Sequence, residues 1–73
     1  MQLLEVKNET AKIIYNPEDN KLLPSDFLLI EDSSQKLVGQ ISSIYNTAGS
    51  TNNTADVRLV LYIDQDNKLS YYN

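Results

Sequence analysis

The residues of this chain that could do chemistry are carboxylates, hydroxyls and lysines, because its 73 residues include neither histidine nor cysteine. Asp64, Asp66 and Asn67 have the spacing with which a calcium-binding loop opens. The match then ends, since Lys68 stands at the fifth loop position, where a ligand is needed, and Leu69 at that of the loop glycine. A hairpin turn capped by Asp and Asn side chains is the better interpretation of this segment.

Paired acids and serines are the remaining candidates for catalysis. Glu18-Asp19 and Glu31-Asp32 could share general acid–base work, but each pair lies beside turn residues, where solvated acids are ordinary. Ser33-Ser34 and Ser42-Ser43 have no base near them in the sequence. No glycine-rich phosphate loop is present, because the two glycines lie ten residues apart. We therefore predict a protein that is not an enzyme, with no catalytic residue, no cofactor and no bound metal.

The charge pattern bears on possible partners. The net charge is −4, from ten acids and six scattered bases. Binding to nucleic-acid phosphates needs clustered Lys and Arg, so direct nucleic-acid binding is disfavoured. The aromatic residues could instead form a stacking platform for single strands, although core filling and subunit contacts are the stronger interpretation in an acidic chain. They are Tyr15, Phe27, Tyr45, Tyr62, Tyr71 and Tyr72.

Two of these aromatic residues are candidates for an interface. Tyr71 and Tyr72 end the last apolar run, and they form exposed hydrophobic surface unless another group covers them. No stretch approaches the roughly 20 apolar residues that span a bilayer, and no signal peptide is readable. The absence of cysteine fits a reducing compartment. We expect a cytoplasmic protein that does not bind membranes.

Strands must position these side chains, because the sequence consists of short apolar runs separated by polar turn residues. The six runs cover residues 3–6, 11–15, 27–30, 36–45, 56–64 and 68–72. In the fifth run, Leu59, Leu61 and Ile63 alternate with other residues and are predicted to lie in the core, as are Leu37 and Ile41 of the fourth. The polar stretch 46–54 predicts a long hairpin loop.

Three residues are predicted to shape turns and bends. Pro24 and Asp26 mark the turn into the third strand, because proline cannot donate to a sheet ladder. Gly39 lies inside the fourth run and predicts a bulge, since the apolar phase changes between Leu37 and Ile44. A short helical turn at 22–26 is an alternative for that segment. Six strands in so short a chain predict one domain, residues 1–73, folded as a small antiparallel β-barrel that is closed or partly open.

Two segments resemble a known family. Residues 23–30, Leu-Pro-Ser-Asp-Phe-Leu-Leu-Ile, resemble the x-P-G-D-Y-V-x-V segment of the HAS-barrel. This is the β-barrel of HerA-type ATPases, related to the N-terminal barrels of ATP synthase α and β subunits. Residues 37–44, Leu-Val-Gly-Gln-Ile-Ser-Ser-Ile, resemble its V-L-G-x-V-x-x-I strand. The resemblance covers about a third of the chain, and Ser25 stands where the family has glycine.

The resemblance implies a function in assembly. In HerA-type proteins the barrel precedes a P-loop motor that forms a hexameric ring on DNA, and the barrels help subunits associate or dock a nuclease. The expected partners are therefore the chain's own C-terminal ATPase domain, neighbouring subunits and a nuclease, and the 73 residues are expected to be the N-terminal part of a longer protein. The alternative is a free-standing binding barrel of the oligonucleotide-binding or PRC-like type.

Overall fold

The computed structural model describes residues 1–33 and 35–72, which form six strands and no helix. Ser34, one of the serines considered above, lies outside the described residues. The strands are β1 (Gln2–Lys7), β2 (Thr10–Tyr15), β3 (Phe27–Glu31), β4 (Lys36–Asn46), β5 (Asn53–Ile63) and β6 (Leu69–Tyr71). Every strand pair is antiparallel. The prediction of an all-β domain with six antiparallel strands is confirmed, and the alternative helical turn at 22–26 is wrong.

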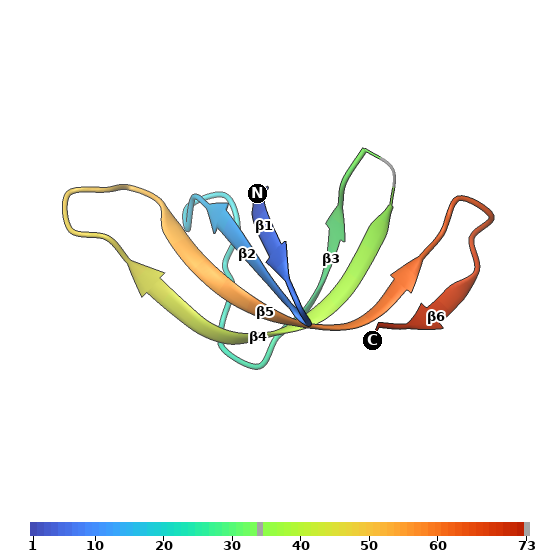
Figure 1. The fold of residues 1–73 in the computed structure, drawn as a ribbon. Coiled ribbons are helices and arrows are strands. Elements are labelled where there is room, and N and C mark those ends of the chain that lie inside the picture. The colour runs from blue at the N-terminus through green and yellow to red at the C-terminus, as the bar shows by residue number, and fades with distance from the viewer. Residues whose placement is uncertain (34, 73) are drawn as a thin grey trace.

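One sheet holds all six strands, in the order β1-β2-β5-β4-β3, with β6 also paired to β5. The long strands β4 and β5 form its middle (Figure 1). The edge of β5 away from β4 is divided between two partners, because β2 pairs with Asn53–Arg58 and β6 with Leu61–Ile63. Two hydrogen bonds lie between the part of β5 that pairs with β2 and the part that pairs with β6. The Leu59 N–H donates to the Glu9 carbonyl, and the Tyr72 N–H donates to the Val60 carbonyl.

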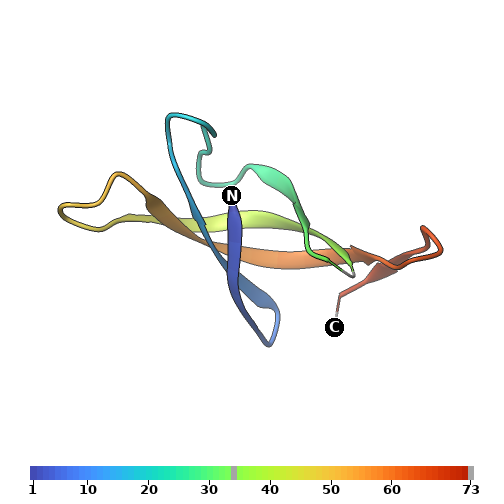
Figure 2. The ribbon, with the colours of Figure 1, turned by 90° about the horizontal axis from the view of Figure 1, so that it is seen from above.

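The sheet is strongly curved but is not closed by hydrogen bonds, so β1 and β3 are edges at the two ends of its strand order. The short strand β6 is a further edge, because it pairs only with β5. Of the two predicted forms, closed or partly open, the structure has the open one. Figures 1 and 2 show the β4–β5 and β5–β6 hairpins extending at opposite ends of the molecule. These extensions account for its elongated dimensions of 41 × 20 × 19 Å.

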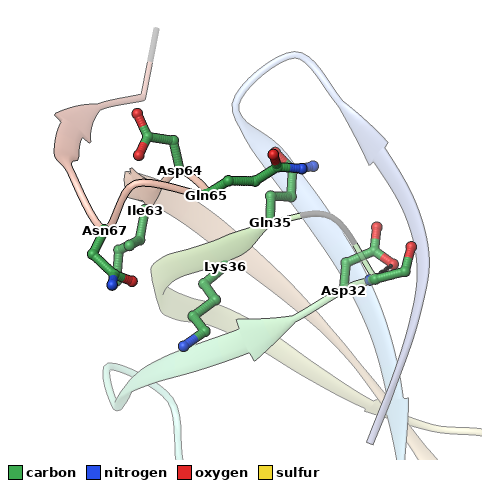
Figure 3. A pocket seen from close by; sticks show the side chains of 8 residues that line it. Asp32, Gln35, Lys36, Ile63, Asp64, Gln65 and Asn67 are labelled. Atoms are coloured by element: carbon green, nitrogen blue, oxygen red, sulfur yellow. Dashed lines mark hydrogen bonds between the residues drawn. The ribbon is translucent and has the colours of Figure 1, made fainter.

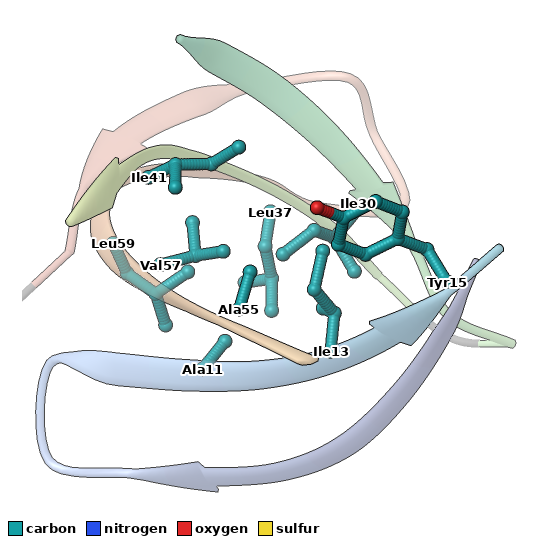
Figure 4. Packing of buried hydrophobic residues seen from close by; sticks show 9 residues of the cluster. All are labelled: Ala11, Ile13, Tyr15, Ile30, Leu37, Ile41, Ala55, Val57 and Leu59. Atoms are coloured by element: carbon teal, nitrogen blue, oxygen red, sulfur yellow. The ribbon is translucent and has the colours of Figure 1, made fainter. Parts of the chain in front are cut away.

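The hydrophobic core lies on the concave face of this curve. Among the described residues, nine buried side chains come from β2, β3, β4 and β5 and converge between those strands (Figure 4). They are Ala11, Ile13, Tyr15, Ile30, Leu37, Ile41, Ala55, Val57 and Leu59. Burying branched side chains from four strands against one another removes most of their apolar surface from water. The sheet therefore holds its curvature by packing around these residues.

Two of the predicted core residues lie elsewhere. Leu61 and Ile63 are only half-buried and are not part of the core. The register explains this difference, because Val38 pairs with Leu61 but Gly39 pairs with Leu59. Val60 is therefore an extra residue in β5, and the alternation of faces reverses after it.

A second irregularity lies further along the same strand pair. Ile41 pairs with Val57 and Ser43 with Asp56, so Ser42 is the extra residue in β4. Beyond it Ile44 packs against the core, although Ile41 also does so three residues earlier. The change of apolar phase in the fourth run therefore arises at Ser42, three residues after Gly39.

Candidate functional site

The acidic segment with calcium-like spacing is a capped hairpin turn. The Asp64 carboxylate oxygen Oδ1 accepts hydrogen bonds from the backbone N–H groups of Asp66 (2.8 Å) and Lys68 (3.0 Å). Asn67 has a φ of 61°, in the left-handed region that Asn tolerates in turns. Residues 1–33 and 35–72 contain no cluster of three or more groups able to hold a metal ion.

A hollow lies between this turn and the β3–β4 turn, and Figure 3 shows the polar side chains around it. Asp32 and Lys36 line it from one turn, and Asp64 and Gln65 from the other. Asp32 is engaged in its own turn, because its Oδ1 accepts the backbone N–H of Ser33 at 2.7 Å. Each acid thus serves the main chain of its own hairpin.

The other described acids and serines are exposed near turns or hydrogen-bond to the nearby main chain. Glu18-Asp19 is exposed in the β2–β3 connection, where the Glu18 N–H donates to the Asn16 side chain at 2.9 Å. Glu31-Asp32 is exposed at the end of β3. The Ser42 hydroxyl donates to the Asp56 carbonyl at 3.1 Å, which satisfies a backbone acceptor beside the β4 bulge.

Pro24 and Asp26 belong to a tight turn that delivers the chain into β3. The Asp26 N–H donates to the Leu23 carbonyl at 3.1 Å, and the Asp26 carboxylate accepts the Leu23 N–H at 2.9 Å. Ser25 has a φ of 75°. Proline at the second position and a positive φ at the third are typical of a type II turn, in which the third residue is usually glycine.

This turn is attached directly to β4. The Ser25 N–H donates to the Ile41 carbonyl and the Ile41 N–H to the Asp26 carbonyl, both at 2.8 Å. The Gln40 side-chain amide donates to the Ser25 carbonyl at 3.0 Å. Three hydrogen bonds therefore fix where β3 begins relative to β4.

Gly39 is buried in β4, close against the main chain of β5. A Cβ atom at this position would lie 2.5 Å from Val57 Cγ1 and 2.7 Å from the Arg58 carbonyl oxygen. Both distances are shorter than any ordinary carbon contact. The glycine is required by this close approach beside the bulged residue Val60.

An apolar row crosses the sheet on the face opposite to the core. Leu29 pairs with Val38, Val38 with Leu61, and Leu61 with Tyr71. Directly opposite residues of antiparallel strands share one face, and Leu37, the neighbour of Val38, points into the core. We call Leu29, Val38, Leu61 and Tyr71 the outer row.

Exposed apolar side chains extend this row. Tyr71 is 79% exposed and Leu29 42%, while Phe27 (65%) and Leu69 (64%) lie two residues along β3 and β6 on the same face. These four side chains expose on the order of 500 Å², if a fully exposed large side chain presents about 200 Å². A hollow of about 360 Å³ lined by Leu61, Leu69, Ser70 and Tyr71 lies beside them.

Charged residues border the outer row. On one side Glu31 pairs with Lys36 and Lys36 with Ile63. On the other side Gln40 pairs with Phe27 and with Arg58. An apolar centre with a polar border is the usual anatomy of a protein interface.

The six aromatic side chains divide between the two faces. Tyr15 is buried, and Tyr62 and Tyr72 pack against the core. Of the two tyrosines predicted as interface residues, Tyr71 is therefore the exposed one. The Tyr45 hydroxyl donates to the Asp56 carboxylate at 3.1 Å. The rings do not gather into a single stacking surface.

The outer row has no direct signal in the sequence. Leu29 and Val38 stood in apolar runs without a predicted face, and Leu61 was predicted in the core. The one available signal was the exposed aromatic pair at the end of the chain, which pointed to Tyr71. The alignment of the other three residues depends on the register of four strands, two of which contain a bulge.

Comparison of the chain with protein-family models, with curated proteins and with solved structures yields no match in any of the three. Within the part of the chain that the structure describes, no helix has the length and apolar character needed to cross a membrane.

Proposed function

We propose that this chain is a non-catalytic assembly module that binds another protein through the outer row. The observation that carries the proposal is the row itself, four apolar side chains in register across four strands on the face away from the core. Together with Phe27 and Leu69 on the same face, Leu29 and Tyr71 expose on the order of 500 Å², which is near the upper end of the roughly 300–600 Å² that the largest patches on monomers reach. Tyr71, an exposed aromatic side chain at one end of the row, is the type of residue that anchors interfaces.

The finer identity we propose is the N-terminal barrel of a HerA-type ATPase. In that setting the module supports ring assembly or docks a nuclease in cytoplasmic DNA processing. The turn before β3 supports this proposal, because Ser25, at the position where the family has glycine, has a φ of 75°. Gly39 supports it as well, since the family glycine of the next strand matches a position that has no room for a side chain.

The partners in this proposal are the neighbouring subunits and the chain's own C-terminal ATPase domain. Both are proteins, in agreement with a surface that has an apolar centre and only isolated charges at its border. Lys36 and Arg58 lie on opposite sides of the outer row. Two separated bases do not form the clustered positive groove that tracks a nucleic-acid backbone.

The reading frame of the source gene tests the ATPase identity. We expect the frame to continue beyond codon 73 into a strand followed by Gly-x-x-x-x-Gly-Lys-Ser/Thr, and the encoded protein to form rings that weaken when residues 1–73 are deleted. A stop codon directly after Asn73 would contradict the ATPase identity and leave a free-standing binding barrel. Rings that assemble equally well without these residues would contradict the assembly role.

A further inference from the structure

The edges at the two ends of the strand order, β1 and β3, differ in how well they are protected from pairing with another strand. The third edge, β6, is only three residues long, and very short edge strands are themselves protected. β1 carries a register shift between Leu3 and Glu5, and it bears the charged residues Glu5 and Lys7. Bulges and charges are the usual devices that prevent edge-to-edge association. β3 has an uninterrupted register with β4, and its first four residues, Phe27–Ile30, are all apolar. Over these four residues β3 therefore has neither a bulge nor a charge.

Alternate residues of β3 hydrogen-bond to β4, and this alternation identifies which of the main-chain groups of β3 face outward. The Ile41 N–H donates to the Asp26 carbonyl, and the Asp32 N–H donates to the Gln35 carbonyl. Both pairs follow the register in which Leu28 lies opposite Gly39. Because bonded and non-bonded pairs alternate along an antiparallel ladder, the even-numbered residues of β3 bond to β4.

The odd-numbered residues Phe27, Leu29 and Glu31 consequently direct their N–H and C=O groups away from β4. Among the described residues, no main-chain hydrogen bond outside the β3–β4 ladder reaches these groups. A groove of about 200 Å³ runs along Leu29–Glu31, with Met1 and Leu3 on its far side. Figure 1 shows β3 rising opposite β1 at the open mouth of the sheet.

We propose that β3 pairs with β3 of a second copy of this chain, antiparallel and centred on Leu29. In this register Leu29 lies opposite Leu29 of the second copy, and Phe27 lies opposite its Glu31. All three pairs are hydrogen-bonded pairs, since each joins two outward-facing residues, and together they supply about six main-chain hydrogen bonds. The pairing uses the donors and acceptors of the edge completely.

The side chains also favour a second copy as the occupant. Leu28 and Ile30 face each other across the two-fold axis on the core side, and the two Leu29 side chains meet on the outer face. No like charges lie directly opposite, because each Glu31 faces a phenylalanine and already has Lys36 as its cross-strand neighbour. The contact is made through the main chain at Leu29, which is one end of the outer row, and it joins the rows of the two copies into one apolar row twice as long.

Amide hydrogen exchange measured by NMR from about 10 µM to about 1 mM tests this pairing. We expect the amides of Phe27, Leu29 and Glu31 to exchange at least about tenfold more slowly at the high concentration. The amides of Leu28 and Ile30 bond to β4 and should be protected equally at both concentrations. Odd-numbered amides that exchange rapidly at every concentration would overturn the proposal.

A pair of variants at Leu29 separates the main-chain contact from the side-chain contact. Leu29→Pro removes an outward N–H without removing a bond to β4, a position at which sheets tolerate proline. We expect it to abolish the dimer in sedimentation analysis, and a synthetic chain with N-methylated Leu29 to do the same. Leu29→Ala keeps the N–H and should still dimerise.

These experiments also distinguish this contact from binding through the outer row. A dimer that persists in the N-methylated chain, without protection of the odd-numbered amides, would overturn edge pairing. It would leave the outer row as the contact between copies. A chain that is monomeric at about 1 mM would overturn the pairing of two copies, while the proposed binding of a different protein to the outer row would stand.

Discussion

We expect Gly39→Ala to lower the free energy of unfolding by about 3 kcal/mol. The added methyl group would lie 2.5 Å from Val57 Cγ1 and 2.7 Å from the Arg58 carbonyl oxygen. Overpacking a core typically costs about 1–3 kcal/mol. The upper end applies here because the carbonyl belongs to the main chain of the neighbouring strand and has no alternative rotamer.

This loss is large relative to the stability of so small a domain. At about 0.05–0.15 kcal/mol per residue, a chain of this length has about 4–11 kcal/mol in total. A loss of about 3 kcal/mol should lower Tm by roughly 12–24 °C. Urea denaturation and thermal melts followed by circular dichroism measure both quantities.

Gly49→Ala is the matched control. Gly49 has a φ of 82° but no atom within 4 Å of a Cβ at that position, so alanine there meets conformational strain alone. We expect this variant to lose about 1 kcal/mol. A Gly39→Ala variant whose free energy of unfolding stays within about 0.5 kcal/mol of the parent would show that the strand contact tolerates a side chain. A Gly49→Ala variant that loses more stability than Gly39→Ala would contradict the role of this contact in the same way.

Three further predictions concern the turns and the binding alternatives. Ser25→Gly should raise Tm by about 4–8 °C, because glycine adopts the left-handed conformation without the cost of about 1 kcal/mol that a side chain carries; an unchanged melt would contradict this. Asp64→Ala should lower the free energy of unfolding by about 1–2 kcal/mol through the loss of two turn hydrogen bonds, whereas Asp66→Ala, which keeps both, should have little effect in the same urea titration. A single-stranded oligothymidine should leave the tyrosine fluorescence unchanged at low salt, and salt-sensitive quenching would instead favour an oligonucleotide-binding barrel.

The local pattern of the sequence was sufficient to predict the strands. Alternating apolar residues and turn signals placed all six, and the polar stretch 46–54 contains the loop of the β4–β5 hairpin. β5 begins three residues earlier than expected, at Asn53, because its main chain pairs with both Tyr15 and Asn46. Long-range pairing of this kind extends a strand into polar residues that have no strand signal of their own.

The alternation of apolar residues predicted on which face a side chain of β5 lies only as far as the bulge at Val60. Leu59 was predicted in the core and is buried there. Leu61 and Ile63 follow the same alternation, but the extra residue Val60 turns them to the outer face. A bulge is fixed by how two strands meet, here at Gly39, and not by the alternation within one of them.

The outer row could not be predicted from the sequence, because it too depends on how the strands are paired. Leu29 and Tyr71 are far apart in the chain and are related only through Val38 and Leu61. Their alignment depends on three strand registers at once, and a shift of one residue in any of them would direct an apolar side chain to the other face.

Native mass spectrometry of the protein encoded by the complete reading frame tests the assembly role most directly. It should compare the parent protein with Tyr71→Lys, which charges the outer row, and with Leu23→Lys, which charges a 66%-exposed leucine in the β2–β3 connection. We predict a ring of subunits each heavier than 8.3 kDa, depleted by Tyr71→Lys and unchanged by Leu23→Lys. A lone 8.3 kDa chain, or rings that form equally well with Tyr71→Lys, would contradict it.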